Sequence, residues 1–471
     1  RMESKLMVWH MLKLMVLACR CGMAKTLSGQ LRQHRLIFVL LRIIDLGFSY
    51  QRARYLHQLP DRLHRLGAGY VKLGQMLATR EDIIGTAMAG RLARLHDNVM
   101  PPCPARMKSW LNRISEQTGL IFAPDPIAAG SVAVVYKARL PDGTCLAVKL
   151  LRPDIKAELI RNLRLIKQTY RFAQWLFPKQ QIIQLDQALE QFGQIIDQEC
   201  DLRIEADNMA RFAQSIRTQP DMISPVVHWE YTNRDMLTMS YHDGYQITDI
   251  TRLKQSGHDP AYLVQTLTQL YFQHIFIDGW FHGDPHPGNI LIDPEGRMVF
   301  LDFGLTGQLD HTARRFLLSV MIAIKHRQTA LLIRLHKRAG MIPDSTNMTA
   351  LTAAIDQVFM HSASDDKSDD IFSQIKAVFH IANRFGIRVA PSWPVLHKTL
   401  IMLDGLIHKM APDGYSEKTI ADWFTDYLLR DMNAAFIPLS MVPVFIEWDQ
   451  ATDHVLLNMW KNSNFQQNKA A

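Results

Sequence analysis

The sequence is poor in cysteine, and its cysteines form no regular pattern. Its 471 residues include five, at Cys19, Cys21, Cys103, Cys145 and Cys200. A sparse, odd-numbered set in a long chain argues against a disulfide framework and favours a reducing, cytoplasmic compartment. Cys19 and Cys21 are too few for a structural zinc site, which needs about four ligands.

Long apolar runs are also missing from the sequence. Residues 6–18 are largely apolar, but His10 and Lys13 interrupt them. Residues 436–446 contain two prolines, which break helices. Both runs are shorter than the about 20 residues that span a bilayer, and no cleavage motif of a signal peptide is clear. We therefore expect membrane contact to be peripheral.

Positive charge is concentrated at the beginning of the sequence. Residues 1–60 contain ten Lys or Arg and two acidic residues, a surplus equal to the net charge of +8 for the whole chain. Within them, residues 31–47 predict an amphipathic helix with Arg32, Arg35 and Arg42 on one side. Such a helix can lie in a membrane interface, so an anionic membrane surface is the expected partner; the alternative is a solvated basic face. Nucleic acid is not expected, because no basic motif interleaved with aromatic residues is present.

The remaining composition is that of a folded globular protein with mixed patterning. Hydrophobic residues make up 48% and charged residues 21%. The turn at 141–143, between runs of β-forming residues, predicts a hairpin within 124–150. Short strand-like runs lie within 223–241. Helical patterning covers 61–120, 155–215 and most of the chain from 259, with a loop predicted at 281–307.

The clearest chemical motif is a series of polar residues with kinase-like spacing. Residues 281–289 read Phe-His-Gly-Asp-Pro-His-Pro-Gly-Asn, and Asp302 begins an Asp-Phe-Gly triplet. Asp284, Asn289 and Asp302 thus follow the spacing of a kinase catalytic loop and its D-F-G segment. Asp284 would lie beside the group that accepts phosphate. Asn289 and Asp302 would bind Mg²⁺, since hard oxygen ligands hold the ion that neutralises a triphosphate.

A lysine upstream completes this pattern. Lys149 ends the strand-like run Leu-Ala-Val-Lys and is predicted to contact the α- and β-phosphates of ATP while pairing with a glutamate on a helix. Glu205 is the preferred partner, because Asp201, Glu205 and Asn208 would share one face of a helix. Glu199 is the alternative.

The segment before Lys149 is predicted to cover the nucleotide. It aligns with the kinase glycine-rich loop, but only one of three glycine positions, Gly130, is a glycine. Alanine adds a methyl group where backbone approaches phosphate, so this cover is expected to close differently from that of an ordinary kinase. The residues predicted to border the nucleotide, in this segment and near the strand-like run at 236–241, are Ala128, Ala129, Gly130, Ser131, Val135, Met239 and Tyr241.

Taken together, these motifs resemble the ABC1/AarF/UbiB atypical kinases, a family associated with ubiquinone biosynthesis. The segment from Tyr70 to Gln75 resembles the family's K-x-G-Q element, followed by Ala78–Arg80 and by Leu95–Pro102. The alanine-rich loop, Glu199-x-Asp201, the catalytic loop and D-F-G occur in the same order. The segment from Phe385 to Gly405 resembles the C-lobe of UbiB.

The resemblance implies an α+β, two-lobed protein-kinase-like fold with an N-terminal helical extension and a predominantly helical C-lobe, binding Mg-ATP between the lobes. The expected parts are a basic N-terminal arm, the K-x-G-Q extension, an N-lobe, a C-lobe and a C-terminal tail. Their predicted limits are 1–60, 61–120, 121–245, 246–430 and 431–471.

The resemblance further implies that Lys72 and Gln75 enter the nucleotide cleft and meet Glu199 and Asp201. This arrangement would obstruct a protein substrate, so ATP hydrolysis or phosphorylation of a small or lipid-like molecule is expected. The residues themselves agree. Gly283 occupies the arginine position of an H-R-D loop, and no A-P-E segment follows within forty residues of Asp302.

Expected partners are therefore ATP, Mg²⁺, isoprenoid or quinone-precursor lipids and other ubiquinone-biosynthesis enzymes, at the inner face of the membrane. The sequence departs from the family at Gly130, where a third alanine is usual, at Val134, and at Asn162. Two alternatives remain open at this stage. One is a small-molecule phosphotransferase of the aminoglycoside or choline kinase type, which would lack the K-x-G-Q element. The other is a nucleotide-binding scaffold without chemistry.

Overall fold

The computed structural model describes residues 58–78, 86–92, 95, 104–176, 183–361, 371–387 and 393–411. The basic arm and its amphipathic helix at 31–47 lie outside these residues, as do the apolar runs at 6–18 and 436–446 and the C-terminal tail. So do Cys19, Cys21, Cys103, Thr79, Arg80 and most of Leu95–Pro102. Predictions made for these segments stay predictions.

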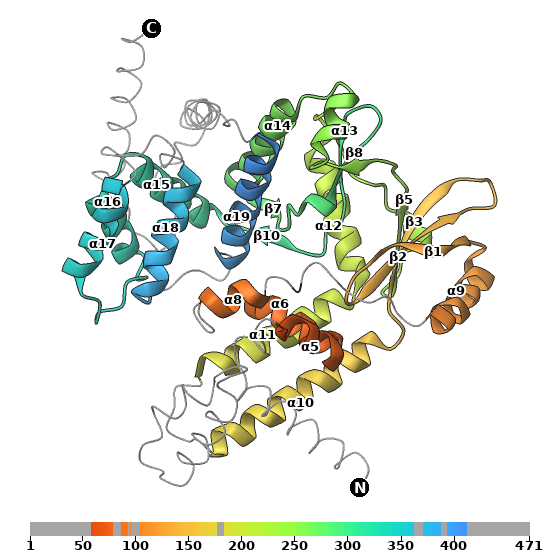
Figure 1. Ribbon diagram of the computed structural model, residues 1–471, viewed down its shortest axis with the longest axis horizontal. Helices are drawn as coiled ribbons and strands as arrows, with labels where there is room; N and C mark the ends of the chain where they lie inside the picture. The colour runs from red at the N-terminus through yellow and green to blue at the C-terminus, as the bar shows by residue number, and fades with distance from the viewer. Residues whose placement is uncertain are drawn as a thin grey trace. The chain divides into compact units, whose positions relative to one another are not determined.

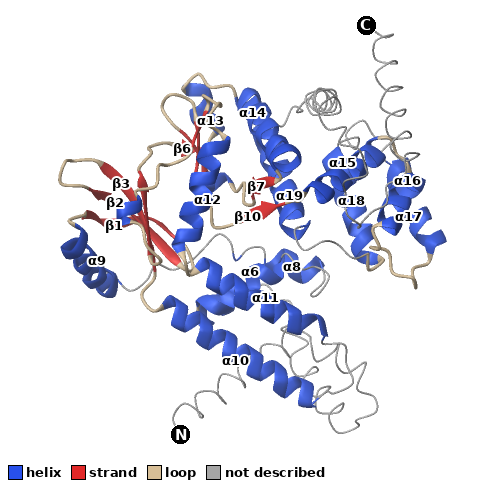
Figure 2. Ribbon diagram, turned by 180° about the vertical axis from the view of Figure 1, so that it is seen from behind, coloured by secondary structure: helices blue, strands red, loops and turns tan. Residues whose placement is uncertain are grey.

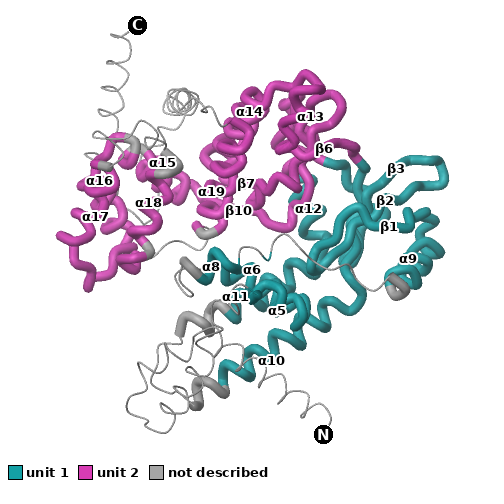
Figure 3. Tube along the Cα trace, viewed as in Figure 1, with its two compact units in different colours: residues 1–211, 225–241 teal, residues 212–224, 242–471 magenta. Residues whose placement is uncertain are grey.

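The chain divides into two compact units (Figure 3). Unit 1 contains residues up to Arg211 together with Pro225–Tyr241, and unit 2 contains Phe212–Ser224 and the residues from His242 onward. The division therefore passes through helix α12 (Leu202–Ser215). The predicted boundary at 245/246 lies four residues from the one found at 241/242, but the limits of the five predicted parts are not tested by this division.

Unit 1 is built around a four-stranded antiparallel sheet of order β1-β2-β3-β5 (Figure 1). Its strands are β1 (Ile121–Ala129), β2 (Ala133–Arg139), β3 (Cys145–Leu151) and β5 (Met236–Ser240). The hairpin predicted within 124–150 is confirmed as β2–β3, with full pairing from Ala133↔Leu151 to Arg139↔Cys145. Gly143 in its turn has φ of 91°, a conformation that favours glycine.

One face of this sheet is closed by helix α9 (Pro104–Thr118). Successive strand residues point to opposite faces, so alternate apolar residues of β2 and β3 reach the same side. The resulting core contains Met107, Leu111 and Ile114 of α9, Val134, Tyr136 and Ala138 of β2, and Leu146, Val148 and Leu150 of β3. The opposite face is thereby left to the other residues of each strand, which include Lys149.

The other helices of unit 1 confirm the helical patterning expected before 120 and over 155–215. They are α5 (Leu59–Leu66), α6 (Ala68–Ala78), α8 (Thr86–Leu92), α10 (Ile155–Leu176), α11 (Ile183–Glu199) and the beginning of α12, with a 3₁₀ turn at Trp229–Tyr231. Helix α6 approaches α10 closely at Gly69, where an added Cβ would lie 2.7 Å from Cβ of Asn162. The backbone amide of Ala68 also donates to Glu158 of α10 at 3.1 Å.

Unit 2 contains short strands between residues 222 and 308, including two within and two at the ends of the segment that was predicted as a loop at 281–307. The described strands form a sheet of order β4-β9-β8-β6 and a pair β10-β7. Their bounds are β4 (Met222–Ile223), β6 (Tyr245–Gln246), β7 (Trp280–His282), β8 (Ile290–Ile292), β9 (Met298–Phe300) and β10 (Thr306–Gln308). Runs of three residues give too weak a period-two pattern to be recognised in the sequence.

Helices make up most of the rest of unit 2 (Figure 2). They are α13 (Ile250–Gln255), α14 (Pro260–Phe272), a π-helical turn at Gln273–Asp278, a 3₁₀ turn at Pro287–Asn289, α15 (His311–Lys325), α16 (Thr329–Arg338), α17 (Met348–His361), α18 (Ile371–Arg384) and α19 (Trp393–Met410). Within the residues that the structure describes, every helix is too short or too polar to cross a membrane.

Candidate nucleotide and phosphoryl-transfer site

The open face of the unit 1 sheet collects several of the predicted nucleotide residues. Lys149 on β3 pairs with Val135 on β2, and Val135 pairs with Ala128 on β1. Directly opposite residues share a face of an antiparallel sheet. Met239 on β5 pairs with Ala147, two residues from Lys149, so it belongs to the same face. The pleat therefore places Ala128, Val135, Lys149 and Met239 together.

Lys149 is bound to the predicted glutamate. Its Nζ atom lies 2.6 Å from Oε1 of Glu205 on α12, and the two side chains are 15% and 7% exposed. A buried carboxylate is stable only when a cation and hydrogen bonds compensate its lost hydration. The pairing expected for Glu205 is thus present, and Glu199, the alternative, binds a different lysine.

The segment after β1 forms a tight loop held from β3. The amide of Gly130 donates to the carbonyl of Ala133 at 2.8 Å, and Nη2 of Arg152 donates to the carbonyl of Gly130 at 2.5 Å. Ser131 within this loop is buried. Ala129 pairs with Val134 and packs against the core under α9, so its side chain points away from the face that carries Lys149. A contact of Ala129 with nucleotide would therefore have to use its backbone, and its predicted place beside the nucleotide stays a prediction.

The K-x-G-Q element brings one of its two predicted side chains to the acids. Lys72 on α6 forms an ion pair with Glu199 at the end of α11. Gln75 instead donates through Nε2 to the carbonyl of Leu95 at 3.1 Å. Asp201 does not share a helical face with Glu205, because α12 begins one residue later, at Leu202. Its carboxylate accepts from the backbone and side chain of Arg203, and this hydrogen bonding lowers the pKa of Asp201.

Tyr241 closes the end of β5. Its amide donates to the carbonyl of Cys145 at 3.3 Å, and Nζ of Lys137 lies 3.8 Å from the centre of its ring. That distance is within the range of a cation–π interaction. Tyr241 is thus fixed at the edge of the unit 1 sheet, where a role toward nucleotide stays a prediction.

In unit 2, the catalytic-loop residues are joined by hydrogen bonds. Nδ2 of Asn289 donates to the carbonyl of Asp284 at 3.2 Å and approaches the carboxylate Oδ2 of Asp284 at 3.5 Å. Asp302 adopts a left-handed conformation, with φ of 56°, and its Oδ1 accepts from the amide of Gly304 at 3.2 Å. Asparagine and aspartate are the non-glycine residues that best tolerate this conformation.

His282 links the two parts of this motif. Its Nε2 lies 2.8 Å from the carbonyl of Asp302, and its Nδ1 accepts from the amide of Asp284 at 3.2 Å. These contacts require a neutral ring with the proton on Nε2. Burial also lowers the pKa of His282, which favours that neutral form. The neutral side chain of His282 therefore forms hydrogen bonds with the backbone of both predicted acidic residues, Asp284 and Asp302.

Aromatic side chains pack against the D-F-G segment. Phe303 is fully buried, with its ring centre 5.0 Å from that of Phe212 and 5.1 Å from that of His282. Phe212 also contacts Phe300 at 4.8 Å. Phe212 lies on α12, two turns after Glu205, so one continuous helix carries the partner of Lys149 and the support of the D-F-G segment. The sequence analysis missed Phe212, although its helical spacing from Glu205 was visible.

Gly283 allows a close approach of helix α19. A Cβ at this position would lie 2.9 Å from Cγ1 of Val395 and 3.1 Å from the carbonyl of Leu305. The first distance is shorter than real Cβ contacts and the second is tighter than most of them, so the arginine of an H-R-D loop has no room here. The absence of that arginine, noted in the sequence, thus agrees with the packing around Gly283.

Helix α19 also supplies two polar contacts that the sequence analysis did not assign. Nζ of Lys398 lies 3.0 Å from Oδ1 of Asp284. The hydroxyl of Thr399, which is fully buried, donates to the carbonyl of Gly283 at 3.1 Å. These residues are separated by more than a hundred positions, and no local pattern connects them.

The residues present fit a magnesium ion shared with phosphate. The Nδ2 atom of Asn289 is engaged as a donor, which leaves its amide oxygen as the acceptor for a cation, and Asp302 adds an exposed carboxylate. Mg²⁺ is commonly bound by one or two such side chains together with substrate phosphates. Within the described residues, no group of three or more His, Cys, Asp or Glu could hold a metal ion by itself. Bound Mg²⁺ would neutralise charge on the triphosphate.

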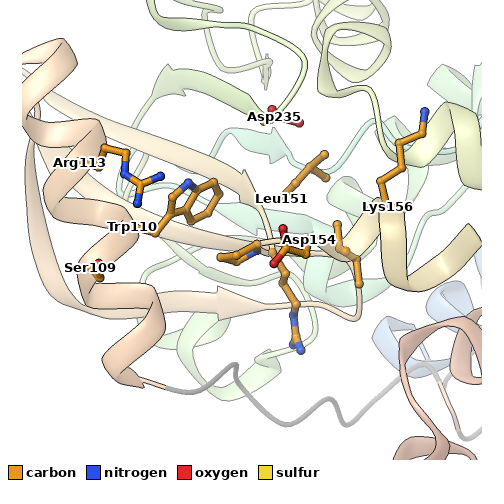
Figure 4. Close-up of a pocket in the computed structure, with 10 residues that line it drawn as sticks. Ser109, Trp110, Arg113, Leu151, Asp154, Lys156 and Asp235 are labelled. Atoms are coloured by element: carbon orange, nitrogen blue, oxygen red, sulfur yellow. The ribbon is translucent and has the colours of Figure 1, made fainter. Parts of the chain in front are cut away.

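A separate pocket of about 410 Å³ lies elsewhere in unit 1 (Figure 4). Trp110 and Arg113 of α9 point toward the segment carrying Leu151 and Asp154. None of the predicted site residues lines this pocket. The cavity is therefore distinct from the face that carries Lys149.

The fold and these paired motifs define a protein of the kinase-like class. Residues 105–336 match the family model for the ABC1 atypical kinase-like domain. The chain is 30% identical over 397 residues to "Probable protein kinase UbiB" of Marinobacter nauticus, covering 82% of this chain and 72% of that protein. It is also 30% identical to the protein of the same name from an Enterobacter species, covering 77% of this chain and 69% of the relative. The chain therefore belongs to the ABC1 family of UbiB-type atypical kinases, as the sequence motifs predicted.

A solved structure of Rv3197 with erythromycin from Mycobacterium tuberculosis aligns with 79% of this chain and 99% of that chain. The identity is 20% and the TM-score is 0.45.

Proposed function

We propose that this protein is an atypical kinase or ATPase that binds Mg-ATP. Lys149, held by Glu205, would contact the α- and β-phosphates. Asn289 and Asp302 would bind Mg²⁺, and Asp284 would orient the phosphate acceptor or the attacking water. The observation that carries this proposal is that each unit holds its half of the motif in ordered geometry: the Lys149–Glu205 pair at 2.6 Å and the His282-linked Asp284 and Asp302 backbones.

In this proposal, most of the rate comes from positioning and charge, because phosphoryl transfer requires little covalent chemistry from the protein. Mg²⁺ held by Asn289 and Asp302 would supply neutralisation of the charge on the triphosphate. The protein's own residues do the rest: His282 fixes the spacing of Asp284 and Asp302, and Asn289 holds the carbonyl of Asp284. Phe212 and Phe303 exclude water beneath the D-F-G segment.

We further propose that the phosphate acceptor is water or a small, lipid-like molecule, and that the protein supports ubiquinone biosynthesis at a membrane surface. Membership of the UbiB-type family supports this role. Residues 282–284 support this role too, because Gly283 has no room for the arginine that binds a phosphorylated activation loop in H-R-D kinases. The Lys72–Glu199 ion pair supports a K-x-G-Q element docked on unit 1.

Asp302→Asn tests this proposal directly, since asparagine retains the size and the left-handed conformation of Asp302. ATP turnover by purified protein should fall by about 10²–10³-fold, the usual loss when one charge-stabilising group is removed. The matched control is Asp310→Asn: Asp310 is also exposed, and its Oδ1 accepts from the amide of Ala313 at 2.7 Å, a bond that asparagine can retain.

Turnover that is equal in wild type and Asp302→Asn would overturn the assignment of the magnesium site. Quinone profiles of a strain lacking its UbiB-type protein test the biological role. Restoration by wild type and Asp310→Asn, but not by Asp302→Asn, is expected. Full restoration by Asp302→Asn would instead indicate a scaffold without chemistry.

A further inference from the structure

The catalytic loop of this protein carries no permanent positive charge of its own. Residues 281–289 contain neither lysine nor arginine. His282 is buried, and its two ring nitrogens are engaged with backbone groups of Asp302 and Asp284, which requires a neutral ring. Phosphoryl transfer nevertheless develops negative charge on the transferred group, and enzymes place cations beside it. A cationic side chain near Asp284 must therefore come from another part of the chain.

Helix α19 brings a lysine to that place. Nζ of Lys398 lies 3.0 Å from Oδ1 of Asp284, while Asn289 approaches the other carboxylate oxygen at 3.5 Å. The carboxylate thus lies between an ammonium and an amide. The side chains of Lys398 and Asp284 are 19% and 28% exposed, so neither is sealed in the core and a ligand can reach both.

Side chains of α19 contact the catalytic loop at Gly283 and fix the placement of the helix. Val395 lies against Gly283, and Thr399 donates to the carbonyl of Gly283. Val395, Lys398 and Thr399 follow an i, i+3, i+4 spacing, which places them on one face of the helix. Figures 1 and 2 show α19 beside β7 and β10, the strands at the two ends of the catalytic segment. The distance from Lys398 to Asp284 is therefore set by packing rather than by a flexible surface contact.

We propose that Lys398 is a further functional residue of the phosphoryl-transfer site, which rests on the function proposed above. Its ammonium orients the carboxylate of Asp284 and faces the terminal phosphoryl group of ATP. Its charge compensates the negative charge that develops there. It takes the place of a cation that the catalytic loop itself lacks.

Affinity labelling with an acyl-phosphate derivative of ATP tests this position without requiring turnover. The amine of a lysine beside the terminal phosphate attacks the acyl carbon, an amide forms, and ATP leaves. We expect labels on both Lys149 and Lys398, identified by mass spectrometry of peptides, and protection of both by Mg-ATP. Label on Lys149 without label on Lys398 would overturn this inference and leave the proposed function standing. Absence of a protectable label on both lysines would contradict the nucleotide site itself.

Kinetics of Lys398→Met and Lys398→Arg separate function from folding. We expect Lys398→Met to lower kcat about 10–100-fold, with KM for ATP changed less than about threefold, because the group acts on the terminal phosphate. Arginine keeps the charge and should restore part of kcat. The midpoint of thermal unfolding should change little, since this ion pair is partly exposed.

The matched control is Lys376→Met. Lys376 on α18 forms an ion pair with Asp404 on α19, a buried carboxylate. Its loss should lower the unfolding midpoint and leave kcat near that of wild type at a temperature where the variant is folded. If Lys398→Met behaved like Lys376→Met, with lost stability and normal kcat, the ion pair with Asp284 would be structural and the inference would be wrong.

Discussion

Two lysine–carboxylate pairs, one in each unit, differ in what surrounds them. In unit 1 the side chain of Glu205 is 7% exposed, and its carboxylate contacts Lys149 on the sheet face that carries this lysine. In unit 2 the carboxylate of Asp284 is 28% exposed and is approached by Lys398 on one side and Asn289 on the other. The first pair is largely buried and fixes the position of Lys149. The second leaves its carboxylate accessible, as a group that acts on a substrate must be.

The largest effect is expected from breaking the largely buried pair. Lys149→Met would leave Glu205 buried without its cation, which typically costs about 3–5 kcal/mol of stability. ATP turnover should fall about 10²–10³-fold. The double variant Lys149→Met/Glu205→Gln separates the two effects: the free energy of unfolding, measured with denaturant, should recover, and turnover should not. Recovery of turnover in the double variant would show that Lys149 only compensates Glu205.

Glycines in the two loops provide a second comparison. Gly283→Ala would force a methyl group against Val395 and Leu305, and overpacking of this kind costs about 1–3 kcal/mol. Gly130→Ala should be nearly neutral, since the nearest atom to its added Cβ, the carbonyl oxygen of Ala133, lies 3.4 Å away. Denaturant unfolding of both variants measures the difference. A second substitution, Val395→Ala, should restore part of the stability lost in Gly283→Ala. Equal stability of the two single variants would contradict the tight contact with α19.

The smallest expected effect is a dependence of the free energy of unfolding on pH, which arises from two histidines of unit 2. Burial lowers the pKa of His274 and of His397 to about 4, with a further lowering from His282 and Lys376, respectively. The unfolded chain binds these protons near pH 6.5, so it binds more protons than the native state at pH 5.5, and the free energy of unfolding falls as the pH drops. Each histidine should contribute a loss of about 1 kcal/mol between pH 7.5 and pH 5.5.

His397→Gln tests this contribution. Stability at pH 7.5 will also change, because His397 stacks on Phe379 with ring centres 4.3 Å apart. The readout is therefore the difference in unfolding free energy between the two pH values, which should shrink by about 1 kcal/mol. An unchanged difference would mean that His397 is protonated in the native state or remains neutral in both states.

The comparison of the two units also shows which parts of the site could be predicted from sequence. Five site residues could be predicted, because each lies on a single strand, helix or loop in which the spacing between residues indicates their chemical role. They are Lys149, Glu205, Asp284, Asn289 and Asp302. Hairpin β2–β3 was predictable for the same reason, since a turn lies between β-branched runs. Membership of the UbiB-type family followed from the order of these segments.

Long-range packing was not predictable in this way. Lys398 reaches Asp284 only because α19 packs on the catalytic loop, and Thr399 and Val395 show no pattern that would indicate it. The strands within 281–307 were missed because each has three residues, too few for a period. Asp201 was placed on a helix that begins one residue later. A shift of one residue in a helix limit or in a strand register changes which side chains share a face.

The central claim of the proposed function is that the protein binds Mg-ATP through Lys149 and Asp302. Calorimetric titration of wild type, Lys149→Met and Asp302→Asn with ATP, with and without Mg²⁺, tests it most directly. The account predicts one nucleotide per chain and an affinity that falls about tenfold or more in either variant, since each loses a charge-assisted contact. The effect of Asp302→Asn should disappear when Mg²⁺ is left out. Two independent sites, or an affinity in Mg²⁺ that Asp302→Asn leaves unchanged, would contradict it.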